Sequence, residues 1–115
     1  MRRGEIFRVS LDPARGSEAA KTRPAVIVSN DAANATAARL GRGVVTVVPV
    51  TSSTASVYPF QVLLEADQTG LSRDSKAQAE QVRSIAVERI GPRMGLLPPA
   101  LMAKLDQALR IQLSL

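Results

Sequence analysis

The stretch VVTVVPV, residues 44–50, is the strongest β-strand signal in the chain. Its apolar residues stand at both odd and even positions, so both faces of the strand are predicted to be buried. Burial on both faces is typical of a strand in the middle of a sheet. We therefore expect the other strands to be arranged around residues 44–50, with Thr51 and Ser52 emerging from the end of this buried strand.

Four other segments carry weaker strand signals, each a short apolar or alternating run next to turn residues. They are residues 4–10, 25–28, 58–64 and 75–87, the last taken as one or two strands. A polar loop over residues 12–22 separates the first two. Residues 31–40 are rich in alanine and are followed by Gly41, which predicts a short helix that ends there.

A second helix is predicted from Pro98 and Pro99 to about Leu113. Proline is tolerated in the first turn because the N–H groups there have no partner within the helix. Apolar residues recur along this segment at helical spacing and define one buried stripe. The stripe consists of Leu101, Met102, Leu105, Ala108 and Leu109.

The predicted elements are five or six short strands, one short helix and one terminal helix, without strict alternation of strands and helices. This pattern favours an α+β fold that is mainly β: a small, strongly curved antiparallel barrel with the C-terminal helix packed on it. At 115 residues the chain is expected to be one domain, residues 1–115. No apolar run approaches the roughly 20 residues of a membrane helix, and no signal peptide is recognisable, so we expect a cytoplasmic protein without a membrane partner.

The composition excludes several classes of site. The chain has no cysteine and no histidine, which removes disulfides, thiol nucleophiles, zinc–thiolate sites and histidine-based triads. No cluster of carboxylates suggests a magnesium site, so neither a metal nor a cofactor is expected. The net charge is +5, with eight basic and four acidic residues in positions 1–50. This charge favours a polyanionic partner but also fits a role in solubility alone.

Three segments carry candidate functional residues. The first is RGSEAAKTRPAV, residues 15–26, which holds Glu18, Lys21 and Arg23. An arginine directly before a proline is held extended, and the forked donors of its guanidinium suit a phosphate. The second is the Thr51–Ser52 pair, whose hydroxyls would be rigidly placed by the buried strand. The alternatives are a solvated surface loop and an ordinary turn.

The third segment is AEQVRSI, residues 79–85, where strand alternation would put Gln81 and Arg83 on one face and Glu80 on the other. Its alternative is a solvated strand face. Tyr58 and Phe60 are two of three aromatic residues in the chain. They are candidates for stacking on a nucleobase, although core packing is the more common role of such residues.

Taken in order, these segments resemble the MazF/PemK family of toxin endoribonucleases from bacterial toxin–antitoxin systems. No single motif is specific, but five in the family's order extend over most of the chain. They are RRGEIFRVSLDPARGSE (2–18), RPAVIVSN (23–30), VVPVTS (47–52), YPFQVLL (58–64) and EQVRSIAVERI (80–90).

The resemblance implies a PemK-like, SH3-like barrel with a C-terminal helix, assembled as a homodimer. It implies metal-independent cleavage of single-stranded RNA at short sequences, which leaves a 2′,3′-cyclic phosphate and a 5′-hydroxyl and inhibits translation. It also implies a cognate antitoxin whose acidic C-terminal segment covers the RNA site. The family's catalytic arginine, threonine and glutamate fall on Arg23, Thr51 and Glu18, and Ser17 and Gln81 match positions that contact RNA. Lys21, Ser52 and Arg83 complete the predicted RNA-binding set.

The chain departs from some relatives at two places. Gln78 and Glu80 stand where those relatives have an arginine and an aspartate, so a mechanism that uses that arginine as general acid is not available. Ala19–Ala20–Lys21 replaces the usual Gln-Gly pair of the loop. Two other functions stay open at this point. One is a toxin with the same barrel that poisons DNA gyrase without nuclease activity, and the other is a non-catalytic RNA-binding SH3-like module.

Overall fold

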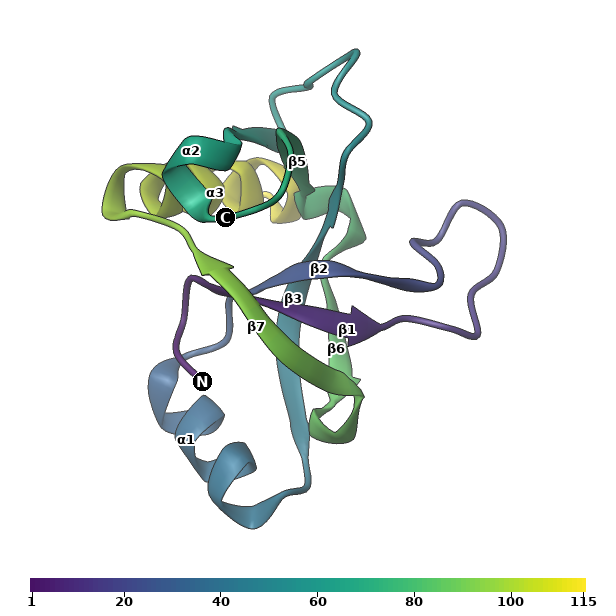
Figure 1. The fold of residues 1–115 in the computed structure, drawn as a ribbon, viewed down its shortest axis with the longest axis vertical. Helices are drawn as coiled ribbons and strands as arrows, with labels where there is room; N and C mark the ends of the chain where they lie inside the picture. Colours follow the sequence, from purple (N-terminus) through teal and green to yellow (C-terminus); the bar gives the residue numbers. More distant parts are fainter.

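The strand β3 (Val44–Thr51) lies at the centre of the sheet in the computed structural model, which describes residues 1–115 (Figure 1). β3 pairs with β2 on one side; on the other it pairs with β6 along its first half and with β5 at its end. The predicted central position of residues 44–50 is therefore confirmed. The strands are β1 (Glu5–Ser10), β2 (Thr22–Ile27), β3 (Val44–Thr51), β4 (Gln61–Leu64), β5 (Ser75–Gln78), β6 (Arg83–Ala86) and β7 (Ile90–Leu96).

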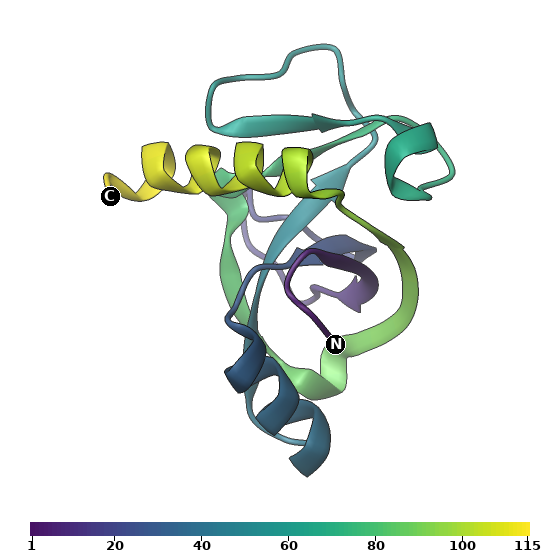
Figure 2. The same cartoon turned by 90° about the vertical axis from the view of Figure 1, so that its left-hand side faces the viewer.

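All pairings in the sheet are antiparallel, and the strand order is β4-β5-β3-β2-β1-β7, with β6 also paired to β3. The sheet is strongly curved, and its two end strands, β4 and β7, are not paired with each other. Three α-helices accompany it: α1 (Asp31–Leu40), α2 (Ala66–Thr69) and α3 (Pro99–Leu113). Figure 2 shows α3 lying across one end of the curved sheet, with α1 at the opposite end. None of these helices has the length and apolar character needed to cross a bilayer.

Alternate residues of β3 enter two separate cores, which explains why the strand is apolar on both faces. Val48 and Val50 belong to the core that is covered by α3. Val45 and Val47 belong to the second core, which includes Ala37 of α1. All four valines are at most 1% exposed. The stripe predicted for the terminal helix is also confirmed, because its members pack into the first core.

Helix α1 has the predicted bounds because both of its ends are capped by local side-chain and backbone chemistry. The Asn30 side chain accepts a hydrogen bond from the Ala33 N–H at 2.8 Å, which satisfies a free donor of the first turn. Gly41 adopts a left-handed conformation (φ 66°) and donates its N–H to the Ala37 carbonyl.

One predicted strand and one predicted side-chain arrangement need correction, whereas the two strands allowed for residues 75–87 are present. The strand expected over residues 58–64 begins only at Gln61, whose backbone N–H bonds the Tyr58 carbonyl and whose side-chain oxygen accepts from the Tyr58 N–H. Tyr58 is 54% exposed and stacks on Phe60 at 5.5 Å, so a core position for Tyr58 is wrong. Residues 75–87 form two strands, β5 and β6, with a 3₁₀ turn (Ala79–Gln81) between them. Gln81 therefore does not lie on a strand, and the alternation argument for it fails.

Strand β7, which pairs with β1, and helix α2 are absent from the sequence prediction, and the two elements contact each other. Gly95 of β7 lies against the end of α2, where a Cβ atom on residue 95 would approach the Thr69 carbonyl oxygen to 2.1 Å. Backbone at this distance leaves no room for any side chain, so the chain must shift to accept one.

Replacing Gly95 by alanine is expected to lower the free energy of unfolding by about 1–3 kcal/mol, the usual range for overpacking a tight contact. The measurement is chemical denaturation of both proteins. Gly16→Ala is the control, because its Cβ would meet nothing within 4 Å and it reports only the strain of a positive φ. A Gly95→Ala protein as stable as the Gly16→Ala protein would contradict the steric explanation.

Candidate active site

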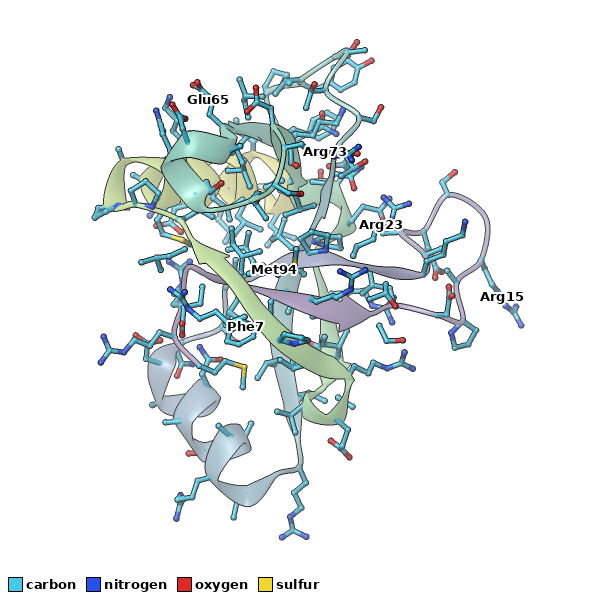
Figure 3. All side chains as sticks on the ribbon, in the orientation of Figure 1. Phe7, Arg15, Arg23, Glu65, Arg73 and Met94 are labelled. Carbon is cyan, nitrogen blue, oxygen red and sulfur yellow. The ribbon has the colours of Figure 1, made fainter.

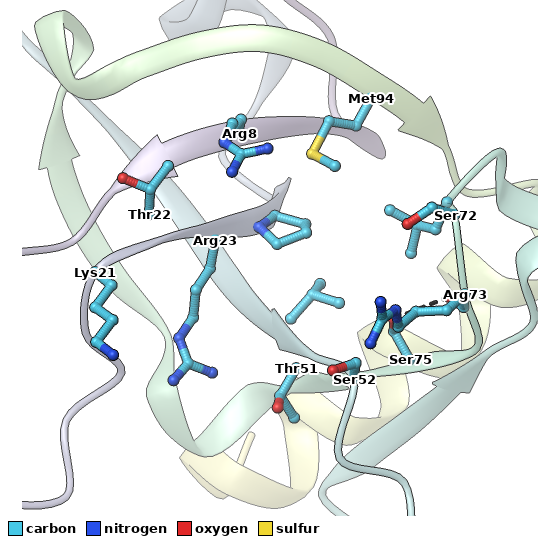
Figure 4. A pocket seen from close by; sticks show the side chains of 13 residues that line it. Arg8, Lys21, Thr22, Arg23, Thr51, Ser52, Ser72, Arg73, Ser75 and Met94 are labelled. Carbon is cyan, nitrogen blue, oxygen red and sulfur yellow. Dashed lines mark hydrogen bonds between the residues drawn. The ribbon is translucent and has the colours of Figure 1, made fainter.

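A cavity of about 480 Å³ opens where the end of β3 meets the start of β2 and the turn before β5 (Figure 4). β1 and β7 contribute one residue each to its wall. The cavity therefore joins segments that are far apart in the sequence. Its lining residues are Arg8, Lys21, Thr22, Arg23, Pro24, Val50, Thr51, Ser52, Leu71, Ser72, Arg73, Ser75 and Met94.

The lining carries four cationic side chains and no carboxylate. The cations are Arg8, Lys21, Arg23 and Arg73, and five residues with hydroxyl groups stand among them. Cationic groups that converge on a cavity without a counter-charge produce a positive potential there, which attracts an anion. The site is thus suited to a phosphate or another oxyanion.

Arg23 is held in place by both its backbone and its side chain. It lies on β2, opposite Val9 of β1, and precedes Pro24 as the extended conformation predicts. Its Nε donates a hydrogen bond to the Ala20 carbonyl at 2.8 Å, which leaves both Nη groups without a partner in the protein. The guanidinium is therefore anchored at Nε, and its two terminal nitrogens stay free to bind a ligand.

Thr51 ends β3 and is half-buried, opposite Lys76 of β5. Its Oγ1 accepts a hydrogen bond from the Ser53 N–H at 3.3 Å, so its own O–H proton stays free to donate. The close view shows the Thr51 and Arg23 side chains projecting from neighbouring strands into the same part of the cavity. A fixed cation and a fixed hydroxyl donor thus meet there.

The β1–β2 loop, residues 11–21, is closed at its base by three hydrogen bonds. Leu11 N donates to Lys21 O at 2.8 Å, and Lys21 N donates to Asp12 Oδ1 at 2.7 Å. Lys21 has a φ of 65°, and its side chain lines the cavity. Arg83 adds a bond from Nη1 to Leu11 O at 3.3 Å. Figure 3 shows Arg15 at the outer end of this loop, away from Arg23 and Arg73.

Gln81 is fully engaged in positioning this loop. Its Oε1 accepts from Ala19 N at 3.0 Å, and its Nε2 donates to Ser17 O at 2.8 Å. Because both ends of the Gln81 amide are bound to the loop backbone, this side chain connects the 3₁₀ turn before β6 to the loop. Ser17 itself is exposed and lines no part of the cavity.

Glu18 lies outside the cavity that holds Arg23 and Thr51. Its Oε2 accepts from Arg15 N at 3.2 Å within the loop. It lines a separate depression of about 390 Å³ together with Glu80, Gln81 and Arg83. Of the eight predicted site residues, the structure brings four into the cavity and leaves four outside. The four inside are Arg23, Thr51, Lys21 and Ser52.

Sequence reasoning missed Arg8 and Arg73. Arg8 stands opposite Pro24 in the β1–β2 ladder, and Arg73 lies in the turn before β5. The adjacency of the β1 and β2 segments could have indicated Arg8, because a hairpin places them side by side. No local signal marks Arg73, since its place depends on how α2 packs against β7.

The sequence profile of a family described as "PemK-like, MazF-like toxin of type II toxin-antitoxin system" matches residues 2–113. Endoribonuclease MazF9 of Mycobacterium tuberculosis is 67% identical over 115 residues, which cover 100% of this chain and 98% of that protein. Endoribonuclease EndoA of Bacillus subtilis is 30% identical over 115 residues, covering 100% of this chain and 96% of that protein.

Solved structures agree with this similarity. MazF (Form-I) from Deinococcus radiodurans superposes with a TM-score of 0.80 at 26% identity, covering 100% of this chain and 97% of that one. An endoribonuclease in complex with its cognate antitoxin, from a mycobacterial species, superposes with a TM-score of 0.77 at 26% identity, covering 100% of this chain and 96% of that one.

Proposed function

The chain belongs to the PemK-like, MazF-like toxins of type II toxin–antitoxin systems, and from this premise we propose that it is an endoribonuclease whose active site is the cavity at the end of β3. The observation that carries the proposal is the meeting of Arg23 and Thr51 in a cavity with four cations and no carboxylate. We propose that the toxin cleaves single-stranded RNA at short sequences without a metal ion. The products would be a 2′,3′-cyclic phosphate and a 5′-hydroxyl. The relatives named endoribonucleases favour this function over gyrase poisoning or RNA binding alone.

The reaction uses a nucleophile that the RNA supplies. The 2′-hydroxyl oxygen attacks the adjacent phosphorus and loses its proton, while the bond from phosphorus to the 5′-oxygen breaks and that oxygen gains a proton. The protein must align the attacking and leaving oxygens and stabilise the charge on the non-bridging oxygens. The free Nη groups of Arg23 can stabilise the negative charge on the non-bridging oxygens, and the Thr51 hydroxyl can donate a hydrogen bond to one of these oxygens.

Arg23 does not suit the role of general base, because a guanidinium keeps its proton in proteins near neutral pH. It can donate to the leaving 5′-oxygen. Glu18 is our candidate for accepting the 2′-hydroxyl proton, and this role requires the β1–β2 loop to move toward bound RNA. Glu18 is exposed and its own hydrogen bond lies within the loop, whereas the two hydrogen bonds that Gln81 makes with the backbone of Ser17 and Ala19 would have to break for this movement.

Replacing Glu18 by glutamine is expected to lower the cleavage rate about 10²-fold, the lower end of the range for a positioned general base. The measurement is single-turnover cleavage of an oligonucleotide that carries the mapped sequence. Glu88→Gln, at an exposed carboxylate outside the cavity, is the control. Near-complete activity in Glu18→Gln would remove Glu18 from the mechanism.

The function itself is tested with purified toxin and a mixed-sequence single-stranded RNA in EDTA, with the new ends mapped by mass. We expect cleavage at a few short sequences, with cyclic-phosphate and 5′-hydroxyl ends. The same experiment identifies the recognition sequence. Intact RNA from folded protein that is free of antitoxin would contradict the nuclease proposal and favour the gyrase-poison alternative.

We propose two protein partners. The similar mycobacterial endoribonuclease was solved with its cognate antitoxin, and the positive lining of the cavity suits an antitoxin whose acidic C-terminal segment covers it. We also propose that each chain is a single toxin domain, residues 1–115, and that two chains form a homodimer. Its support is the exposed apolar C-terminus: Ile111 and Leu113 at the end of α3 are 47% and 51% exposed, and Leu115, beyond the helix, is 84% exposed.

A further inference from the structure

Arg73 is presented to the cavity from a turn that is anchored at four points. Leu71 is buried in the core beneath α3, and Gly70 closes α2 in a left-handed conformation (φ 85°). Asp74 Oδ1 accepts from Ala66 N at 2.9 Å, and Ser75 Oγ donates to the Arg73 carbonyl at 3.0 Å. The backbone on both sides of Arg73 is therefore tied to the core, to α2 and to β5.

The guanidinium of Arg73 has no acceptor in the protein. The three ion pairs of the structure involve other cations, and the adjacent carboxylate, Asp74, is turned to the first turn of α2. An arginine whose forked donors are free, on an anchored turn that faces three other cations, is well suited to an anion from outside the chain.

The place of Arg73 in the cavity differs from that of Arg23. Figure 4 shows Arg73 beside Ser75 on one wall, whereas Arg23, on β2, and Lys21, at the end of the β1–β2 loop, lie on the other. Apolar side chains of Val50, Leu71 and Met94 also line the cavity. A strand of RNA carries one phosphate per nucleotide with a sugar between them, so a cavity with two cationic walls and an apolar part fits one step of the RNA backbone.

We propose that Arg73 binds a phosphate that neighbours the scissile one, while Arg23 and Thr51 take the scissile phosphate itself. This inference rests on the proposed function, because it assigns a second phosphate subsite to the same RNA. Arg73 is a binding and positioning residue: it holds the backbone in register for in-line attack and touches no reacting atom. Its contribution is to the affinity for RNA and to its salt dependence.

The test uses a short oligonucleotide that carries the mapped cleavage sequence with a 2′-deoxy sugar at the attacking position, so that it binds without being cleaved. Binding is measured by fluorescence anisotropy for the wild type and Arg73→Gln. Arg73→Gln is expected to weaken binding about 10-fold or more, as expected for loss of a hydrogen bond to a charged group. The slope of log Kd against log salt should fall by about 0.7, the value for one phosphate contact on a single strand.

A second series of oligonucleotides identifies the phosphate. Each carries one uncharged methylphosphonate in place of one phosphate near the cleavage site. We expect one replacement, at a phosphate that neighbours the scissile one, to weaken binding to the wild type about 10-fold and to have little effect on Arg73→Gln. Arg42→Gln is the matched control, because Arg42 is exposed in the turn between α1 and β3 and does not line the cavity.

Three outcomes would overturn the inference. One is that Arg73→Gln binds RNA as tightly as Arg42→Gln does. Another is that no methylphosphonate next to the scissile position weakens binding to the wild type more than binding to Arg73→Gln, or that only the replacement of the scissile phosphate itself does so. The third is that wild-type toxin does not bind the oligonucleotide, which would count against the proposed function as well. If the wild type cleaves RNA but Arg73→Gln binds RNA as tightly as the wild type does, the proposed function stands and only the inference is contradicted.

Thermal unfolding of Arg73→Gln should match that of the wild type, since the Arg73 side chain is exposed.

Discussion

Replacing Arg23 by alanine is expected to lower the rate of RNA cleavage by about 10²–10³-fold, the usual loss on removing one preorganised donor from a site of charge development. The physical reason is that its two Nη groups are free while Nε is fixed on Ala20 O. A donor held in this way needs little reorganisation as charge grows on the phosphoryl oxygens. The measurement is single-turnover cleavage of an oligonucleotide that carries the mapped sequence, with toxin in excess.

Arg23→Lys separates charge from geometry. A lysine keeps the positive charge but loses the fork that bonds the Ala20 carbonyl and a phosphate at the same time. Its activity should therefore lie between that of the wild type and that of Arg23→Ala. Arg42→Ala, which removes an exposed arginine outside the cavity, should cleave like the wild type. Cleavage at the wild-type rate by Arg23→Ala would refute the assignment of the active site to this cavity.

The elements that could be predicted from the sequence are those with local causes. Helix α1 ends where it was expected because Asn30 and Gly41 cap it through neighbouring residues. Strand β3 is recognisable because its two faces are buried in two cores, which makes nearly every residue apolar. The C-terminal helix follows from its proline start and its apolar stripe.

The elements that could not be predicted depend on contacts between distant segments. Strand β7 contains Gly91 and Gly95, which weaken any strand signal, and both are required by close backbone neighbours. The 3₁₀ turn at Gln81 interrupts an alternating run because its side chain bonds the β1–β2 loop across more than 60 residues. No window of local sequence contains that information.

The same distinction applies to the candidate site. Arg23 and Thr51 could be proposed because each stands at the end of a predicted buried strand, and antiparallel pairing of β2 with β3 brings those ends together. Arg73 reaches the cavity through the packing of α2 on β7 and could not be proposed. Glu18 illustrates the converse, since the family resemblance assigns it a role and the structure places it in a neighbouring depression.

Replacing Thr51 by valine is expected to lower the cleavage rate by about 10²–10³-fold, because valine keeps the shape of the side chain and removes the Thr51 hydroxyl proton, which is free to donate. Thr51→Ser keeps that hydroxyl and should retain most of the activity. The measurement is the same single-turnover assay. The matched control is Thr46→Val, a half-buried threonine on the same strand that does not line the cavity.

The combined variant decides whether Thr51 and Arg23 act on one phosphate. If both donors stabilise the same developing charge, the double variant Arg23→Ala/Thr51→Val should lose less than the product of the two single losses, because groups that act as a unit are not additive. A double variant whose loss equals that product would assign the two residues to separate tasks. Wild-type activity in Thr51→Val would remove the hydroxyl from the mechanism, and cleavage would then rest on the cationic lining of the cavity alone.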